Sequence, residues 1–488
     1  MTGSTAQTAA PRPASRTARR LPGTTLQRFG VTLAVLVPLL VLVVDIPGLE
    51  PPAQRMLAVF AVAVILWVTE AIPLVATAVL VIFLQVLLIS DEALVGFGAA
   101  VAGPGGEVFE APTAASIYAT LAHPVIILFL GGFLLADGAA KYRLDRNLTA
   151  VLLRPFRSNL RLTVLGLMLI TAVLSAFMSN TATTATMLAV LVPVLAVSPS
   201  PSARTGLALS IPVAAAVGGL LTPVSSPPNA IAVGTLADHG HPLTFVDWLV
   251  ATTPLVLVLL AIAWALLSVR YLDRGTAVDI DITVDLDTRP RAVLFYVVAA
   301  VTVLLWLSEA VHGIPAATVA FLPVTVLLAT SVMTGEDLRR LQWPVLWLVA
   351  GGIALGSGVA ATGLDEWLIG LVDWAAMPGL VVTLGLLALA ILLGTLISNS
   401  ATANLLIPLV PGLAVTVGTD SVVTAVGLAV VCGLGMALPV STPPNAIAYA
   451  TGEIKTKDMA TIGIAVGVAG LLLVAFVMPL WWSLTGLS

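Results

Sequence analysis

The sequence predicts an all-α polytopic membrane protein with about eleven transmembrane helices and two re-entrant hairpins, and three observations support this prediction. The chain has 488 residues, of which 59% are hydrophobic and only 9% are charged, whereas soluble domains carry roughly 25% charged residues. Apolar runs of spanning length follow one another along the chain. Polar and proline-containing motifs interrupt such runs at matching places in the two halves of the chain.

The residues before the first apolar run form a separate segment. Residues 1–29 are rich in Thr, Ala and Pro and carry basic but no acidic side chains, which is typical of a disordered cytoplasmic tail. The run that follows, Val31–Val44, lacks a small-residue cleavage site, so we expect a retained first span and not a signal peptide. The single cysteine, Cys432, excludes a disulfide within the chain and is expected to be a small buried hydrophobic side chain.

The predicted spans follow from apolar runs, since about 20 apolar residues cross a bilayer as a helix. The uninterrupted runs are Phe29–Ile46, Met56–Val68, Ala71–Ile89, Pro124–Ala140, Phe245–Val269, Ala292–Ala310, Pro315–Val332, Pro344–Thr362 and Met459–Leu484. Thr205–Leu221 and Asp420–Leu438 are further apolar runs, and each continues into a proline motif. The formal net charge of −4 is too small to indicate a charged partner, and no nucleic-acid partner is expected.

Two polar segments break apolar stretches where a simple span would have none. The segment Ser179–Thr184 interrupts the stretch from 160 to 197, and Ser398–Asn404 interrupts the stretch from 380 to 417. In hydrocarbon a broken helix leaves backbone groups unpaired, so such a break survives only where protein or a water-filled cavity satisfies them. A matching pair of breaks in two halves of a chain is the sequence signature of a transport site.

The distribution of basic residues predicts the topology, because cytoplasmic loops carry an excess of Lys and Arg. With a cytoplasmic N-terminus, every basic cluster lies inside only if stretches 160–197 and 380–417 each leave and re-enter on one side. Both are therefore predicted to be re-entrant hairpins, of opposite orientation, and the C-terminus to lie outside. Arg55 is the exception. The basic clusters are the tail, Lys141–Arg161, Arg204, Arg270–Arg291, Arg339-Arg340 and Lys455/Lys457, and the acidic connections hold Asp91, Glu92, Glu107 and Glu110, and Asp365, Glu366, Asp373 and Asp420.

An internal repeat supports this topology independently. The motif at Trp67–Ala71 matches that at Trp306–Ala310, and Gly131-Gly132 matches Gly351-Gly352. The two polar breaks match each other, and so do the proline motifs Thr222–Ala232 and Leu438–Ala448. In the predicted topology the two copies are inverted, which is the architecture of secondary transporters. The first copy is longer near its front, and we place the insertion in the loop from Asp91 to Ala114.

The proline motifs are expected to unwind their helices, because proline cannot donate a backbone hydrogen bond and clashes with the preceding turn. Freed carbonyls, such as those of Ser225 and Ser441, then become ligands for a hard cation. The half-helices that resume after Asn180, Asn399, Asn229 and Asn445 present free N–H groups to anions. Ser, Thr and Asn are also ordinary helix caps, but two breaks in inverted copies, each paired with a proline motif, favour a binding site.

The charge balance narrows the ligand. No Lys or Arg lies within either polar break or either proline motif. Each helix N-terminus offers roughly half a positive charge, so two facing ends match a monoanion but not a dianion. Two bound Na⁺ ions would bring a dianion close to neutrality and would give ion coupling a physical basis.

Other ionisable residues in or near the spans are weaker candidates. Glu70, Glu309 and Asp137, the last beside Lys141, lie near span ends, where capping or pairing is the expected role. Glu70 and Glu309 remain less favoured candidates for a proton pathway. The four histidines, His123, His239, His241 and His312, show no metal-ligand spacing.

The Ser-Asn-Thr and Ser-Thr-Pro-Pro-Asn motifs, at matching places in both repeats, resemble those of the divalent anion:sodium symporter family, the di- and tricarboxylate transporters. The resemblance covers nearly the whole chain after about residue 30. It implies eleven spans, two re-entrant hairpins and a homodimer in which a transport domain slides against a scaffold as an elevator. It divides the chain into scaffold helices at 30–140 and 292–362, interfacial helices at 141–159 and 363–378, and transport-domain parts at 160–269 and 379–488.

The resemblance also implies site residues. The substrate carboxylates would be held by Ser179, Asn180, Thr181, Ser398, Asn399, Ser400, Thr442 and Pro443. The first Na⁺ site would use Ser175, Ser179, Asn180 and Ser225, and the second Gly394, Ile397, Asn399 and Ser441. The sequence departs from the family pattern at Ser400, where threonine is expected; serine keeps the hydroxyl but lacks the methyl group.

The sequence therefore predicts a Na⁺-coupled transporter of C4-dicarboxylates (succinate, malate or fumarate) in the cytoplasmic membrane. The alternatives are a Na⁺-independent dicarboxylate exchanger and a sulfate or citrate carrier. An anion channel would use similar helix-end sites. We do not expect an enzyme, because covalent catalysis needs a positioned nucleophile and base, and no His, Lys or Asp lies near either break.

Overall fold

The computed structural model describes residues 25–97, 108–156, 159–197, 200–272, 286–372, 374 and 377–487, and in these ranges the chain is helical with no strand. The predicted all-α fold is confirmed. Most of the predicted tail (1–24), residues 98–107 of the loop that would hold the insertion, and Asp373 lie outside the described residues. Nine of the described helices are long and apolar enough to cross a membrane.

The first repeat runs from the N-terminus to about residue 270. Its helices are α1 (Thr25–Val43), α2 (Pro51–Thr69), α3 (Leu74–Leu88), α4 (Ala114–Ala119), α5 (Pro124–Lys141), α6 (Leu144–Leu152), α7 (Leu160–Phe177), α8 (Asn180–Val197), α9 (Pro201–Gly218), α10 (Pro227–Asp238) and α11 (Phe245–Arg270). A 3₁₀ turn at Thr120–Ala122 joins α4 to α5, and another at Arg154–Phe156 follows α6. The short α6 lies within the predicted interfacial segment.

The helices of the second repeat are α12 (Pro290–Leu307), α13 (Glu309–His312), α14 (Ala316–Val319), α15 (Phe321–Ala329), α16 (Gly335–Arg340), α17 (Trp343–Thr362), α18 (Leu364–Gly370), α19 (Gly379–Leu396), α20 (Asn399–Leu406), α21 (Val410–Val417), α22 (Ser421–Gly433), α23 (Pro443–Tyr449), α24 (Thr456–Phe476) and α25 (Met478–Thr485). A 3₁₀ turn at Ile407–Leu409 joins α20 to α21. In the second repeat α12, α17, the pair α19 and α20, and α23 carry the motifs that α2, α5, the pair α7 and α8, and α10 carry in the first.

Matching contacts in the two repeats show that they share one structural plan. The indole nitrogen of Trp67 donates to the carbonyl of Leu74 at 3.2 Å, and that of Trp306 donates to the carbonyl of Ala316 at 3.0 Å. Both indoles are buried. The duplicated glycines also act alike: a Cβ at Gly131 would lie 2.5 Å from the Ala320 carbonyl oxygen, and a Cβ at Gly351 would lie 2.5 Å from the Ala78 side chain. Each glycine thus allows a close approach to a helix of the other repeat.

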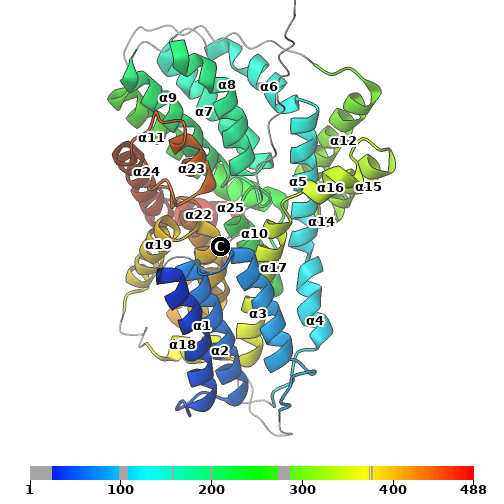
Figure 1. The fold of residues 1–488 in the computed structure, drawn as a ribbon, viewed down its shortest axis with the longest axis vertical. Coiled ribbons are helices and arrows are strands. Elements are labelled where there is room, and N and C mark those ends of the chain that lie inside the picture. Colours follow the sequence, from blue (N-terminus) through cyan, green and yellow to red (C-terminus); the bar gives the residue numbers. More distant parts are fainter. Residues whose placement is uncertain are drawn as a thin grey trace, which may run out of the picture.

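Figure 1 shows how these elements are distributed along the molecule. The helices α1, α2, α3 and α18 lie at the lower end of the long axis, and α6, α7, α8 and α9 lie at the upper end. The paired arms of the first hairpin, α7 and α8, pack against α9, and α19 and α20 of the second hairpin pack against α22. The half-helices α10 and α23, which follow the proline motifs, lie between these groups (Figure 1).

The hairpin breaks are shorter than the polar segments that predict them. The first is confined to Met178 and Ser179, and the second to Ile397 and Ser398, because the polar residues that follow form the first turns of α8 and α20. The hydroxyl of Ser179 accepts from the backbone N–H of Ala182 at 3.3 Å, and that of Ser398 accepts from Ala401 at 3.1 Å. These serines are therefore helix caps as well as candidate ligands.

The helices after the proline motifs begin earlier than expected. The sequence predicts that they resume after Asn229 and Asn445, but α10 begins at Pro227 and α23 begins at Pro443. This expectation was wrong because the first position of a helix needs no N–H donor, so proline is well accommodated there. The unwound segments therefore end at Ser226 and Thr442.

Two charged residues have partners that the sequence does not indicate. Lys141 pairs with Asp337 of α16 at 2.6 Å and donates to the Val332 carbonyl at 3.1 Å, so its partner is not Asp137. Arg55, the exception in the topology, donates to the Leu88 carbonyl at 3.1 Å and lies 4.0 Å from the ring centroid of Phe97. Arg55 therefore ties the end of α3 to the segment that follows it.

Candidate functional site

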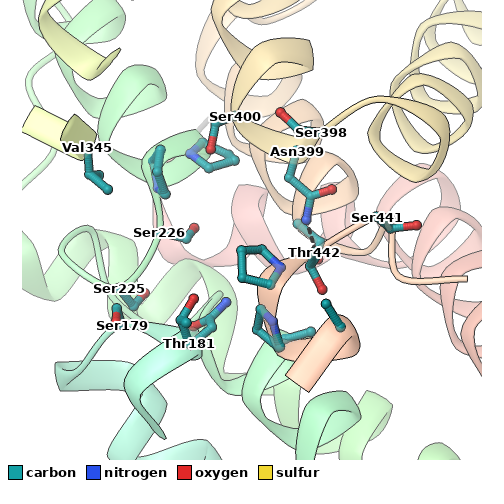
Figure 2. Close-up of a pocket in the computed structure, with 18 of the residues that line it drawn as sticks. Ser179, Thr181, Ser225, Ser226, Val345, Ser398, Asn399, Ser400, Ser441 and Thr442 are labelled. Carbon is teal, nitrogen blue, oxygen red and sulfur yellow. Dashed lines mark hydrogen bonds between the residues drawn. The ribbon is translucent and has the colours of Figure 1, made fainter. Parts of the chain in front are cut away.

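A cavity of about 820 Å³ lies where the two hairpin tips meet the two proline motifs. Figure 2 shows Ser179 and Thr181 on one side of it and Ser398, Asn399 and Ser400 on the other, with Thr442 next to Asn399. All eight residues that the sequence predicts to bind substrate line this cavity: Ser179, Asn180, Thr181, Ser398, Asn399, Ser400, Thr442 and Pro443. The fold thus brings together segments that are more than two hundred residues apart in the chain.

The first hairpin tip forms a compact oxygen cluster with α9. The Ser175 hydroxyl lies 2.7 Å from Asn180 Oδ1 and 2.9 Å from the Ala215 carbonyl oxygen. Gly219 faces the same amide so closely that a Cβ there would overlap Asn180 Oδ1. Ser225 lines the cavity beside this cluster, and its hydroxyl donates to the Gly219 and Thr222 carbonyls at 2.6 and 2.7 Å.

The second hairpin tip repeats this arrangement with α22. The Asn399 amide donates to the Gly433 carbonyl at 3.4 Å, and its Oδ1 is buried without a hydrogen-bond partner among the described residues. A Cβ at Gly435 would lie 2.9 Å from this oxygen, and a Cβ at Gly394 would lie 3.1 Å from it. Gly394 takes the place of Ser175 in the second repeat, so this cluster lacks one hydroxyl. Ile397 and Ser441 line the cavity beside it.

Two asparagines stabilise the unwound segments before the half-helices. Asn229 Nδ2 donates to the carbonyls of Gly219 and Thr222 at 2.9 and 2.8 Å. Asn445 Nδ2 donates to the carbonyls of Met436 and Leu438 at 2.7 and 2.9 Å. A broken helix frees such carbonyls, and in a buried position each must find a partner. The asparagine of each motif supplies that partner.

The donor set of both clusters fits an alkali cation. Hard cations prefer oxygen ligands, and unwound carbonyls of broken helices are the usual Na⁺ ligands in secondary transporters. Each cluster offers an asparagine amide oxygen with nearby carbonyls and hydroxyls, and the unpartnered Asn399 oxygen is an acceptor that a cation would satisfy. Among the described residues no group of three or more His, Cys, Asp or Glu side chains could hold a metal ion.

Glu70 is the only charged residue that lines the cavity within the described chain. Its repeat counterpart Glu309 lies elsewhere and accepts from the backbone N–H of Phe245 at 3.4 Å. The two acids, which the sequence treats as a pair, therefore have different surroundings. No Lys or Arg lines the cavity in the part of the chain described, so helix ends and hydroxyls are its main positive features.

Several other lining residues are not predicted from the sequence. Gln342, at the start of α17, donates to the Ser179 hydroxyl at 2.8 Å. Ser226 lines the cavity with a buried hydroxyl that has no partner among the described residues. The repeat could have identified Ser226, since it is the counterpart of Thr442. Phe129 of α5 and Tyr449 of α23 add aromatic surface.

The remaining candidates lie outside the cavity. His123 Nε2 is 3.2 Å from Asp238 Oδ1 at the end of α10, which is a pairing and not a metal site. Cys432 is buried in α22, as predicted from its apolar run.

The fold and the site define the class: this is a multi-pass, all-helical membrane transporter whose helices break at a central cavity. Comparison with known proteins agrees. A sequence profile described as "Citrate transporter" matches residues 64–433, well over half of the chain. The chain belongs to this family, and the resemblance to di- and tricarboxylate transporters noted in its motifs is confirmed.

Relatives of similar length support the assignment. The chain is 29% identical over 480 residues to an uncharacterized transporter of Haemophilus influenzae, with 93% of this chain and 97% of that protein covered. It is 28% identical over 512 residues to the sodium-dependent dicarboxylate transporter SdcS of Staphylococcus aureus, with 96% and 94% covered.

Solved structures share the fold at much lower identity. The YdaH transporter of Alcanivorax borkumensis is similar with a TM-score of 0.53 and 14% identity, over 89% of this chain and 99% of that one. MtrF of Neisseria gonorrhoeae is similar with a TM-score of 0.50 and 11% identity, over 93% and 97% of the two chains. At these identities the likeness concerns the fold alone.

Proposed function

We propose that the protein carries C4-dicarboxylates such as succinate, malate or fumarate across the cytoplasmic membrane, coupled to Na⁺. The main observation is the cavity itself, where two helix N-termini, at Asn180 and Asn399, meet among hydroxyl groups without any lysine or arginine in the described lining. Helix ends alone leave a dianion undercompensated. Two Na⁺ ions at the oxygen clusters of Asn180 and Asn399 supply the missing charge. The name of the Staphylococcus aureus relative agrees with both parts of the proposal.

We assign the site roles from the family motifs, and the cavity lining supports the substrate set. Ser179, Asn180 and Thr181 hold one carboxylate, and Ser398, Asn399 and Ser400 hold the other, while Thr442 and Pro443 close the pocket beside them. Ser175, Ser179, Asn180 and the Ser225 carbonyl hold the first Na⁺, and Gly394, Ile397, Asn399 and the Ser441 carbonyl hold the second. Because Asn180 and Asn399 belong to both sets, each bound cation orders a residue that contacts substrate, which is the physical basis of coupling.

The proposed motion is an elevator within a homodimer. The hairpins pack on α9 and α22, and α17 packs most on α3, which is consistent with a transport domain (160–269 and 379–488) and a scaffold (30–140 and 292–362). Helix α17 also contacts α10 and α20, so it lies at the proposed boundary between the two. The segments around α6 and α18 join the two as interfacial helices. The substrate crosses the bilayer as the first group slides against the second.

Uptake of succinate into proteoliposomes tests the function. We expect uptake into empty vesicles that requires an inward Na⁺ gradient. Without Na⁺ bound at the two oxygen clusters, the dianion would enter the cavity without counter-charge. Uptake only into succinate-loaded vesicles, without a need for Na⁺, would show an exchanger. Sulfate and citrate are assayed in parallel, and uptake of one of them in place of succinate would reassign the substrate. Continuous flux without counter-transport, faster than a carrier allows, would indicate a channel.

Cysteine labelling tests the proposed orientation, with a cytoplasmic N-terminus and an outer C-terminus. Cys432 is fully buried, and a Cys432→Ala background removes this single native thiol at the loss of one sulfur atom. In that background, Ser483→Cys should react with a membrane-impermeant thiol reagent added to intact cells, and Lys455→Cys should react only after permeabilisation. Both native side chains are exposed. The reverse pattern would invert the topology and contradict the positive-inside assignment.

A further inference from the structure

We propose that Gln342 is a positioning residue that makes the Ser179 hydroxyl a dedicated hydrogen-bond donor to the carboxylate of the substrate. This inference deepens the proposed function and rests on it. Gln342 immediately precedes α17, lines the cavity, and donates from Nε2 to Ser179 Oγ at 2.8 Å. It is half-buried, and no family motif that the sequence shows includes it.

The hydrogen bonds around Ser179 determine what its hydroxyl can do. A serine hydroxyl has two acceptor lone pairs and one donor proton. Ser179 Oγ accepts from the Ala182 backbone N–H at 3.3 Å and from Gln342 at 2.8 Å, so both lone pairs are used. The proton remains, and no described residue accepts it. Because the hydroxyl then has no lone pair left for a cation, Ser179 would serve the first Na⁺ through its backbone carbonyl. An ionised carboxylate only accepts hydrogen bonds, so it is the complementary ligand for this hydroxyl.

The second hairpin lacks this device. The Ser398 hydroxyl accepts from the Ala401 N–H at 3.1 Å and has no second donor within the described residues. It can therefore rotate and act as donor or acceptor. The two hairpin tips match in sequence, but only the Ser179 hydroxyl has a fixed orientation with its proton available to an anion.

The contact also crosses between two groups of helices. Ser179 lies at the turn between α7 and α8, in the proposed transport domain, whereas Gln342 immediately precedes α17, in the proposed scaffold. Helix α17 packs most on α3 and also contacts α10 and α20 of the transport domain. In the proposed elevator these groups move against each other. The Gln342–Ser179 contact then belongs to one position of the elevator, and it tightens substrate binding in that position only.

The kinetics of Gln342 variants test the inference in proteoliposomes. We expect Gln342→Ala to raise KM for succinate about tenfold, the usual effect of one hydrogen bond to a charged group, with little change in the maximal rate. Gln342→Glu should raise KM further at pH 8. An ionised carboxylate at this position accepts a hydrogen bond from Ser179, so the Ser179 proton points away from the substrate, and it also adds negative charge to the cavity. Below about pH 4 most of the introduced carboxyl groups are protonated and donate again, so KM relative to wild type should recover.

Comparison at each pH removes other causes. Dividing the KM of each variant by the wild-type KM at the same pH cancels the titration of succinate itself. For Gln342→Ala this ratio of KM values should not change with pH. Recovery of Gln342→Glu in one preparation at low pH also shows that the variant is folded. A Gln342→Glu protein that binds succinate as well as wild type at pH 8 would overturn the inference, since it would mean that Ser179 donates to residue 342.

A double-mutant cycle shows whether Gln342 acts through Ser179. If it does, Ser179→Ala with Gln342→Ala should have a KM within about twofold of Ser179→Ala alone, whereas independent contributions would multiply. The matched control is Gln85→Ala. Gln85 is buried outside the cavity and donates to the Ala354 carbonyl of α17 at 2.9 Å, so its loss should lower stability and leave KM unchanged. A wild-type protein without any succinate uptake would reject the proposed function; active wild type with unaffected Gln342 variants would reject only this inference.

Discussion

Asn399→Ala is expected to lower Na⁺-dependent succinate uptake by at least about 100-fold while leaving the protein folded. Asn399 would serve the second cation and a substrate carboxylate together, and even outer-shell partners of metal sites are worth about 10–100-fold in affinity. The fold should survive, because Asn399 Oδ1 is buried without a partner among the described residues and the amide nitrogen loses only a long hydrogen bond of 3.4 Å to the Gly433 carbonyl. Uptake and thermal unfolding, each with and without Na⁺, measure the two effects.

The thermal measurement separates a lost site from a lost fold. A cation that binds only the native state stabilises it by about 2.7 kcal/mol at 100 times its dissociation constant. Wild type should show a Na⁺-dependent rise in Tm, and Asn399→Ala should show a smaller one because one of two clusters is lost. If Asn399→Ala took up succinate at the wild-type rate, the site assignment would be wrong. Asn180→Ala should also abolish uptake, although it additionally removes one of the two acceptors of the Ser175 hydroxyl.

Asn404→Ala is the matched control for Asn399→Ala. Asn404 lies in the same helix α20, is fully buried, and also has an unpartnered Oδ1 within the described chain. Its amide donates to the Leu348 carbonyl at 3.3 Å, and it does not line the cavity. We expect it to keep the Na⁺-dependent rise in Tm. Equal losses in both variants would point to a general effect of α20.

The spans and breaks were predictable because a bilayer imposes strong rules on sequence. Long apolar runs identify spans, and a polar or proline break in such a run requires a local explanation. The repeat then links Ser179 with Ser398 and Ser226 with Thr442, although only Thr442 was carried into the predicted site. The sequence could place these positions in matching elements, and the structure shows that they share one cavity.

Other features depend on packing that periodicity does not encode. Gln342 precedes a span like any interfacial polar residue, and only the fold places it against Ser179. Likewise, Glu70 and Glu309 occupy equivalent sequence positions but differ in surroundings, because only Glu70 lines the cavity. Helix starts at Pro227 and Pro443 were misplaced because the asparagines of these motifs resemble caps, whereas they hold the freed carbonyls.

Gly219→Ala should lower coupled uptake at least about tenfold through a single added methyl group. A Cβ at this position overlaps the Asn180 amide, which is a side chain, so Asn180 can rotate away and the fold can survive. Overpacking of this kind costs about 1–3 kcal/mol, yet the rotated amide no longer faces Ser175 and the Ala215 carbonyl, so the first oxygen cluster is dismantled. We expect a loss of at least about tenfold in uptake and a reduced Na⁺-dependent rise in Tm.

Gly385→Ala supplies the comparison, because it adds the same methyl group to a helix of the second hairpin, α19, with nothing within 4 Å of the new Cβ. It should transport like wild type.

The second cluster offers a stricter test of the repeat. Gly435 is the counterpart of Gly219, but a Cβ there would lie 2.6 Å from the backbone carbon of Gly394, which cannot rotate away. Gly435→Ala should therefore lower stability as well as uptake, whereas Gly219→Ala should lower mainly uptake. If Gly219→Ala kept full Na⁺-coupled transport, Asn180 could not be a cation ligand in its present position, and the two hairpins would differ in function as well as in detail.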